Sequence, residues 1–181
     1  FKSSADWTPI HTACVQVIKK QLSNMIMLAV PRIGKEIDEN GVESMPPPLC
    51  ISVDASEYAV GVTMSQEQEN GIEQPIIMAH KTLSVEQRGW STSERECYGL
   101  MWAIHHKLRP YVFGHDNVIV YTDHKPLLGI FRKASSNAKL RRWANTLSMY
   151  NFTIEYRCGV DMGPSDTLSR CSEDAPSLTQ L

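Results

Sequence analysis

The sequence predicts an α/β fold, in which a five-stranded mixed sheet carries helices on both faces. Three observations predict this class. Three β-like segments follow one another between residues 49 and 81, helix-like segments then alternate with strands, and "NVIVYTD" (117–123) is continuously apolar, as in a strand buried on both faces. The order βββαβαβα indicates three antiparallel hairpin strands followed by helix-linked, parallel strands.

The first part of the chain precedes the predicted sheet. The segment "TPIHTACVQVIKKQL" (8–22) favours a helix, because Thr8 can cap it and Pro9 suits the first helical position. "MLAVP" (27–31) is typical of a short strand or an extended link. Residues 34–48 contain two glycines, several acids and "PPP", which predicts a linker and an internal boundary.

The remaining elements follow in order. Residues 49–53 and 58–64 predict strands joined at "DASE", and "PIIMAHK" (75–81) predicts a third strand. "STSERECYGLMWAIHHKL" (91–108) predicts a helix of about 16 residues, capped by Ser91 or Thr92 and followed by Pro110. After 117–123, we expect a mostly helical stretch from Pro126 to about Tyr150, a strand at "FTIEYR" (152–157) and a short final helix at "PSDTLSR" (164–170).

Composition limits the function classes. The 181 residues suit one domain, or a domain with an appendage, and the chain opens on Phe1, as a piece of something larger would. Five scattered cysteines without a CxxC pair indicate a reducing compartment and argue against a disulfide or zinc framework. No apolar run approaches the roughly 20 residues that span a bilayer. The net charge of −2 gives no overall sign of nucleic-acid binding.

Two acids follow strands that we expect to be neighbours. Asp54 ends the first strand, in "PPLCISVDASEYAVGV", and Asp123 ends the later apolar strand. A single Asp after a strand is commonly a turn former or a helix cap. If the two strands are parallel neighbours, however, both carboxylates emerge at the same sheet edge, where open α/β sheets bind ligands.

Two further acids extend this set. Glu96 shares a helical stripe with Leu100 and Ala103 and is expected to face the sheet, whereas Glu94, about 200° around the helix, is expected to be solvated. A Glu on the apolar face of a core helix is costly unless it is paired or bound to metal. Asp166, in "GPSDTLSR", is the fourth candidate, with helix capping as the alternative.

The chemistry of such a cluster is specific. Carboxylate oxygens suit Mg²⁺ or Mn²⁺, whereas zinc prefers His and Cys. Two Mg²⁺ ions about 4 Å apart stabilise the attacking and leaving oxygens of an in-line phosphoryl displacement. The residues alone therefore predict a metal-dependent phosphodiesterase.

Six motifs follow one another between residues 49 and 170, about two thirds of the chain: "VDASEYAVGV", "KTLSVEQRGWSTSERECYGLMWAI", "RPYVFG", "YTDHKPL", "LRRWANTLSMYNFTIEYRCG" and "PSDTLSR". In these motifs and in their order, the chain resembles the ribonuclease H domain of Gypsy-type LTR retrotransposon reverse transcriptases. "DWTPIHTACVQVIKKQL" (6–22) is similar to the segment that joins the polymerase thumb to this domain.

The resemblance implies a fold, a chemistry and partners. It implies the ribonuclease H-like fold, with Asp54, Glu96, Asp123 and Asp166 as catalytic residues and ligands of two Mg²⁺ ions, which Mn²⁺ can replace. The implied reaction is hydrolysis of the RNA strand of an RNA–DNA hybrid by a metal-activated water. The implied partners are the hybrid and the polymerase domain of the same polyprotein, without a membrane, in a cytoplasmic retroelement particle or the nucleus.

The implied division of the chain has three parts. Residues 1–48 would form a connecting segment from the polymerase, 49–170 the ribonuclease H domain and 171–181 a flexible tail or linker.

The chain departs from the family pattern before Asp166. Met162 stands where Asn is common, and Ser165 replaces the usual Ala. The link from "EYRCG" to Asp166 is short and has no histidine, unlike the histidine-bearing loop of retroviral and cellular ribonucleases H. Either water handling and product release differ, or His124 takes a share; the alternative for His124 is a structural hydrogen-bonding role.

Candidate substrate-binding residues fall in two groups. We expect the RNA strand to be approached by the residues after Asp54, which are Ala55, Ser56 and Glu57. His124 is a further candidate for binding nucleic acid. The basic run comprises Arg132, Lys133, Lys139, Arg141 and Arg142. This run is a candidate for contacting the other strand, with a solvated face as the alternative.

The tryptophans are expected in the core, and two alternative functions fit the sequence less well. Trp143 favours core packing over stacking on bases, and Trp90 and Trp102 are assigned to the core on the same reasoning. A catalytically silent module that binds nucleic acid or serves architecture is the alternative function, but such a module has no need of four acids. An integrase on the same fold fits less well, because its acid spacing differs.

Overall fold

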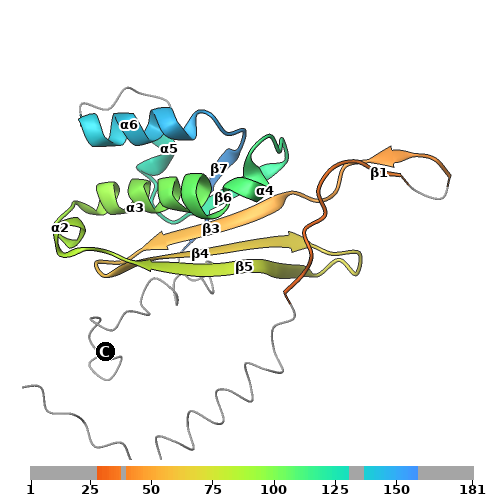
Figure 1. Ribbon diagram of the computed structural model, residues 1–181, viewed down its shortest axis with the longest axis horizontal. Coiled ribbons are helices and arrows are strands. Elements are labelled where there is room, and N and C mark those ends of the chain that lie inside the picture. Colours follow the sequence, from red (N-terminus) through yellow and green to blue (C-terminus); the bar gives the residue numbers. More distant parts are fainter. Residues whose placement is uncertain (1–27, 38–39, 131–136, 159–181) are drawn as a thin grey trace, which may run out of the picture.

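The computed structural model describes residues 28–37, 40–130 and 137–158, which form a central sheet with helices. The sheet has the strand order β5-β4-β3-β6-β7 (Figure 1). Its strands are β3 (Leu49–Ala55), β4 (Ala59–Glu67), β5 (Glu73–Thr82), β6 (Val118–Thr122) and β7 (Thr153–Tyr156). β3, β4 and β5 pair antiparallel, whereas β6 runs parallel to β3, and β7 parallel to β6. The predicted five-stranded mixed sheet is therefore confirmed.

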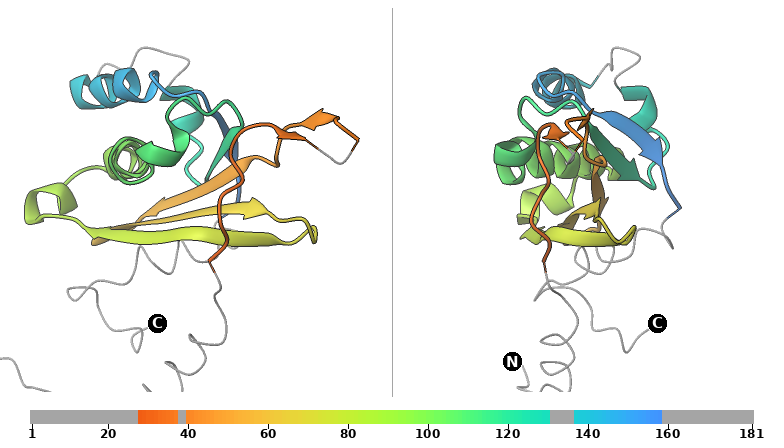
Figure 2. Two further views of the ribbon diagram at one scale, coloured as in Figure 1. Left: turned by 45° about the vertical axis from the view of Figure 1, so that its right-hand side comes forward. Right: turned by 90° about the vertical axis from the view of Figure 1, so that its right-hand side faces the viewer.

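The helices lie on one side of the sheet (Figures 1 and 2). They are α2 (Val85–Arg88), α3 (Thr92–Met101), the π-helix η1 (Trp102–Lys107), α4 (Arg109–Val112), α5 (Leu127–Ile130) and α6 (Ala138–Leu147). α3 packs on β3, and α6 packs on α3. The segments 8–22 and 164–170, for which we also predicted helices, lie outside the described residues, and no described helix covers the opposite face.

The predicted helix at 91–108 is present as α3 followed by η1. Ser91 is its N-cap and forms a capping box with Glu94. Gly99 allows close packing on the sheet, because a Cβ atom added there would lie 3.1 Å from Cγ1 of Val60. At the far end, the helix widens into η1, where the Leu108 N–H donates to the Ala103 carbonyl.

The hydrophobic core lies between the sheet and α3. Ile51, Val62, Leu100 and Ile104 are among its fully buried members. Trp143 of α6 is only 6% exposed, which agrees with the packing interpretation. Its ring lies 5.4 Å from Trp90, and Trp102 also packs against the core. α6 is thus attached to α3 through aromatic side chains.

Residues 28–37 and 40–48, here called the arm, contain an element that the linker prediction missed. A short hairpin of β1 (Glu36–Ile37) and β2 (Glu43–Ser44) projects from the body of the domain (Figure 1). Gln66, fully buried in β4, fixes the arm: its Nε2 donates to the carbonyls of Arg32 (3.0 Å) and Pro47 (2.7 Å), and its Oε1 accepts from the Arg32 N–H.

No helix among the described residues is long and apolar enough to cross a membrane.

Candidate active site

Three of the four predicted carboxylates meet at one edge of the sheet. Asp54 lies near the end of β3, and Asp123 follows β6 directly. Because these strands are parallel neighbours, both side chains emerge at the same edge, and α3 places Glu96 beside them. One carboxylate oxygen of each residue lies within 4.8 Å of the other two. The fourth predicted residue, Asp166, lies outside the described residues.

The cluster is strongly acidic, and two of its three members are largely buried, whereas Asp123 is more open to solvent. Asp54 is 9% exposed and Glu96 only 4%. Burial, and next the charges of Asp54 and Asp123, raise the pKa of Glu96 to about 9, although a hydrogen bond from the Ala55 backbone opposes this shift. In the absence of a cation, the three acids therefore cannot all be charged at neutral pH without a large energetic cost.

The residues fit a divalent metal ion. The Oε2 atom of Glu96 is buried and has no hydrogen-bond partner among the described residues. A buried carboxylate oxygen without a hydrogen-bond partner is destabilising, and a cation held by the three carboxylates would offset this cost. A set of three carboxylates offers the hard oxygen ligands that Mg²⁺ and Mn²⁺ prefer.

His124 is held beside the cluster by hydrogen bonds. The ring Nε2 of His124 lies 2.9 Å from Oγ of Ser93, in the first turn of α3. The backbone N–H of His124 donates to Oγ1 of Thr122. Desolvation lowers the pKa of His124, which favours the neutral ring, while the charge of Asp123 acts in the opposite direction. These contacts are those expected for the hydrogen-bonding role of His124.

The three residues after Asp54 differ in their availability to a ligand. Ser56 stabilises the β3–β4 turn: its Oγ accepts from the N–H groups of Tyr58 and Ala59, and its own N–H donates to the Ala59 carbonyl. Ala55 is buried, whereas Glu57 is exposed. The Ser56 hydroxyl therefore already has a structural role within the turn.

The prediction that Glu94 is solvated is wrong. Its side chain is only 15% exposed and bonds to Ser91 in the capping box. It also accepts a hydrogen bond from Asn137 Nδ2 at 3.2 Å and pairs with Lys139 at 3.6 Å. The spacing of Ser91 and Glu94 is the capping-box signature, so the sequence contained a sign that Glu94 is engaged.

The ion pair between Lys139 and Glu94 distinguishes Lys139 from the other described members of the basic run. Lys139 is paired with Glu94, and its Nζ also lies 4.5 Å from the centre of the Trp90 ring. Arg141 and Arg142, by contrast, are exposed on α6. Arg132 and Lys133 lie outside the described residues. Among the described members of the run, Arg141 and Arg142 are therefore exposed on α6, whereas Lys139, with 43% of its side chain exposed, is engaged by Glu94.

A mixed sheet of this order, with a carboxylate cluster where β3 and β6 end, defines the class of ribonuclease H-type hydrolases. The chain belongs to the family described as the RNase H-like domain found in reverse transcriptase, whose sequence model matches residues 45–150.

Relatives and a solved structure agree with this family. The chain is 34% identical to the retrovirus-related Pol polyprotein from transposon 412 of Drosophila melanogaster over 91% of its own length and 12% of that protein. It is 32% identical to the Pol polyprotein from transposon gypsy of the same organism, over 68% of the chain and 11% of that protein. The chain thus spans about one eighth of the first of these relatives.

The solved structure is a foamy viral protease-reverse transcriptase in complex with double-stranded DNA. It matches with a TM-score of 0.51 and 17% identity, over 85% of this chain and 30% of that chain. At this identity the likeness concerns the fold.

Proposed function

We propose that this chain is a metal-dependent endoribonuclease that hydrolyses the RNA strand of RNA–DNA hybrids, as one domain of a retroelement reverse transcriptase. The observation that carries the proposal is the convergence of Asp54, Glu96 and Asp123, of which Glu96 has a buried carboxylate oxygen without a hydrogen-bond partner in the described part of the chain. Family membership supports the class of reaction.

The proposed role of the acids is to bind two divalent ions. Asp54, Glu96 and Asp123 would hold Mg²⁺ or Mn²⁺, with Asp166 as a further ligand. When bound, such ions stabilise the attacking and leaving oxygens of a phosphodiester displacement. The buried position of Glu96 on α3 keeps one carboxylate desolvated, which strengthens its attraction for a cation.

The substrate is proposed to lie across the edge that carries the cluster. Glu57, which is exposed on the β3–β4 turn, and His124 are candidates for contacts near the cut. Arg141 and Arg142 are the described candidates for phosphate contacts with the other strand, since Lys139 is already paired. The foamy viral match was solved with double-stranded DNA, and duplex binding by this chain is part of the proposal.

The domain limits and the setting are proposals as well. We infer that residues 1–48 connect to a polymerase, 49–170 form the nuclease and 171–181 form a tail or linker. The polymerase domain of the same polyprotein would be the partner, within a cytoplasmic retroelement particle or in the nucleus.

A silent architectural module is the alternative. Such a module would gain nothing from a buried carboxylate without a partner, because burial of this group costs folding stability. The orphan Oε2 of Glu96 therefore favours the enzyme.

Cleavage assays test the proposal. A labelled RNA–DNA hybrid is incubated with the 181-residue chain in Mg²⁺ or Mn²⁺, beside Asp54→Asn, Glu96→Gln and Asp123→Asn. We expect the parent chain alone to cut the RNA strand, and RNA duplex and DNA duplex to stay intact. Measurable hybrid binding without cutting at any concentration of protein or metal would favour the architectural module.

A further inference from the structure

We propose that the arm and the neighbouring Phe113 form an apolar docking surface for the polymerase part of the same polyprotein. This inference rests on the proposed function, because it takes the chain to be one domain of a reverse transcriptase.

The arm presents an unusual amount of exposed apolar surface. Six of its aliphatic side chains are more than half exposed: Val30 (79%), Ile37 (69%), Val42 (59%), Leu28 (55%), Met45 (53%) and Ile33 (52%). The surface continues onto the body of the domain, because Ile33 and Met45 line a cavity of about 200 Å³ together with Phe113, which is itself 59% exposed. Ile33, Met45 and Phe113 thus share one surface, and exposed apolar groups gathered in this way are typical of a protein–protein contact.

The arm is held in place rather than hanging loosely. Besides the contacts of Gln66, the Asn117 side-chain amide donates to the Pro46 carbonyl at 2.9 Å, and the Ala29 N–H donates to the Pro75 carbonyl at 2.8 Å. Because both ends of the arm are anchored to the sheet, the hairpin is presented in a defined direction. A preorganised surface loses little conformational entropy when a partner binds.

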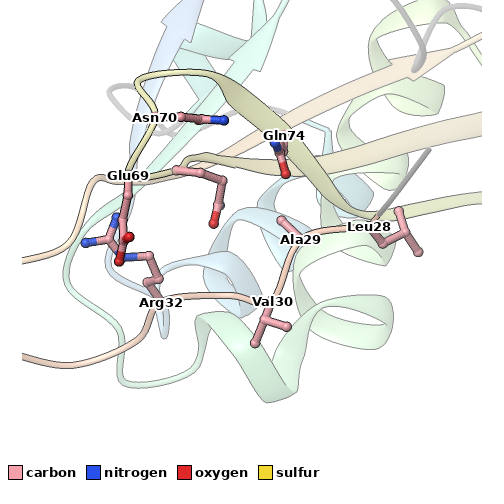
Figure 3. A pocket seen from close by; sticks show the side chains of 8 residues that line it. Leu28, Ala29, Val30, Arg32, Glu69, Asn70 and Gln74 are labelled. Atoms are coloured by element: carbon pink, nitrogen blue, oxygen red, sulfur yellow. The ribbon is translucent and has the colours of Figure 1, made fainter. Parts of the chain in front are cut away.

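The charges of the arm do not suit nucleic acid. Its two basic side chains, Arg32 and Lys35, are ion-paired within the arm, to Glu36 and Glu43 respectively. Figure 3 shows Arg32 beside Glu69 at the open groove between the arm and the β4–β5 turn, and the charge of Glu69 adds to the stabilisation of the Arg32 cation. Because these cations are already compensated, the apolar side chains are what the arm offers, and a protein surface is the partner that they fit.

The position of the arm in the chain indicates which protein would bind it. The family match starts at residue 45, so most of the arm lies before the nuclease domain proper. The relatives are much longer polyproteins, of which this chain covers about one eighth in the first case. A neighbouring domain joined through the arm is held at high effective concentration, which favours contact with the arm over contact with a free protein.

Binding in trans tests the inference. The 181-residue chain and the polymerase part of its parent polyprotein are prepared as separate proteins, and their Kd is measured by calorimetry. Ile37→Asp, Val42→Asp and Phe113→Asp are compared with Val85→Asp, a matched control that is 85% exposed on α2, away from the arm. We expect each arm or Phe113 variant to weaken binding about tenfold or more, because a charge replaces a buried apolar group. The control should stay within about twofold of the parent.

Each outcome has a distinct meaning. Equal binding by the parent and all variants, or no binding by the parent, would overturn the docking surface. Self-association of the parent that the arm variants abolish would assign the surface to a second copy and also overturn the inference. Hybrid cleavage by the same samples reports separately on the proposed function. If the arm variants lose the docking that the parent shows, but the parent does not cleave the hybrid, the docking surface is supported and the nuclease function is rejected.

Discussion

Oγ of Ser93 and Nε2 of His124 lie 2.9 Å apart, and this contact joins the element that carries Glu96 to the residue that follows Asp123. The side chain that marks the "TDH" stretch thus ties the start of α3 to the end of β6. The spacing of the carboxylates depends on both elements, so this contact is well placed to maintain it.

The first prediction concerns that contact. Ser93→Ala and His124→Ala should each raise the metal concentration needed for half-maximal cleavage by about tenfold, as is common when a group supporting metal ligands is lost. Ser84→Ala is the matched control, because Ser84 bonds to Gln87 within α2 and not to His124. Metal titrations of the cleavage rate provide the measurement. An unchanged metal requirement in both variants would assign the contact to stability alone.

The second prediction concerns the stability of the metal-free protein. The pKa of Glu96 is raised to about 9 in the folded state, well above the ordinary value of 4.5. The folded state therefore binds the proton more tightly, and the resulting stability is full below pH 4.5 and is lost as the pH rises towards 9. In EDTA, we expect the Tm of the parent to fall between pH 5 and 9, and Glu96→Gln to show a shallower fall. Circular dichroism melts check this, and parallel pH profiles for the two proteins would contradict it.

The third prediction uses two glycines on helices. Gly99→Ala should destabilise the domain by about 1–3 kcal/mol, because the new methyl group would lie 3.1 and 3.3 Å from the Val60 methyls. Gly129→Ala meets nothing within 4 Å and should be neutral or stabilising by up to about 1 kcal/mol. Urea unfolding of both variants measures the difference. Similar unfolding free energies would mean that α3 can move off the sheet easily.

The fourth prediction separates the basic residues of α6. Arg141→Ala and Arg142→Ala should each weaken hybrid binding and reduce the slope of log K against log salt by about one. Lys139→Ala should change this slope less, because Lys139 is engaged with Glu94 and Trp90. Fluorescence anisotropy at several salt concentrations gives the slopes. A larger effect for Lys139 than for the two arginines would show that its ion pair opens for the substrate.

Much of the sheet was predictable because its signals are local. Alternating or continuous apolar runs located every strand of the central sheet within a few residues, and the stripe through Glu96 and Leu100 correctly predicted the buried face of α3. The proximity of Asp54 and Asp123 followed from strand order alone. These features depend on periods of two and 3.6 residues, which a sequence shows directly.

The remaining features depend on partners distant in sequence. Beyond its local capping box, Glu94 is also bonded by Asn137, 43 residues later, and no pattern around Glu94 indicates this partner. The hairpin of the arm has few apolar contacts of its own and so resembled a linker in composition. Gln66 lies beyond the predicted strand 58–64, and its burial depends on Arg32, which crosses it from 34 residues earlier in the chain.

That buried glutamine separates the unit of homology from the unit of folding. The family match starts at residue 45, yet two of the three hydrogen bonds of the Gln66 amide go to the backbone of Arg32. A protein trimmed to the homologous boundary would lose both of those hydrogen bonds and keep only the bond from Gln66 to the Pro47 carbonyl, at a net cost of about 0.5–1.5 kcal/mol for each bond lost. A stable excised nuclease of this lineage should therefore start upstream of Arg32.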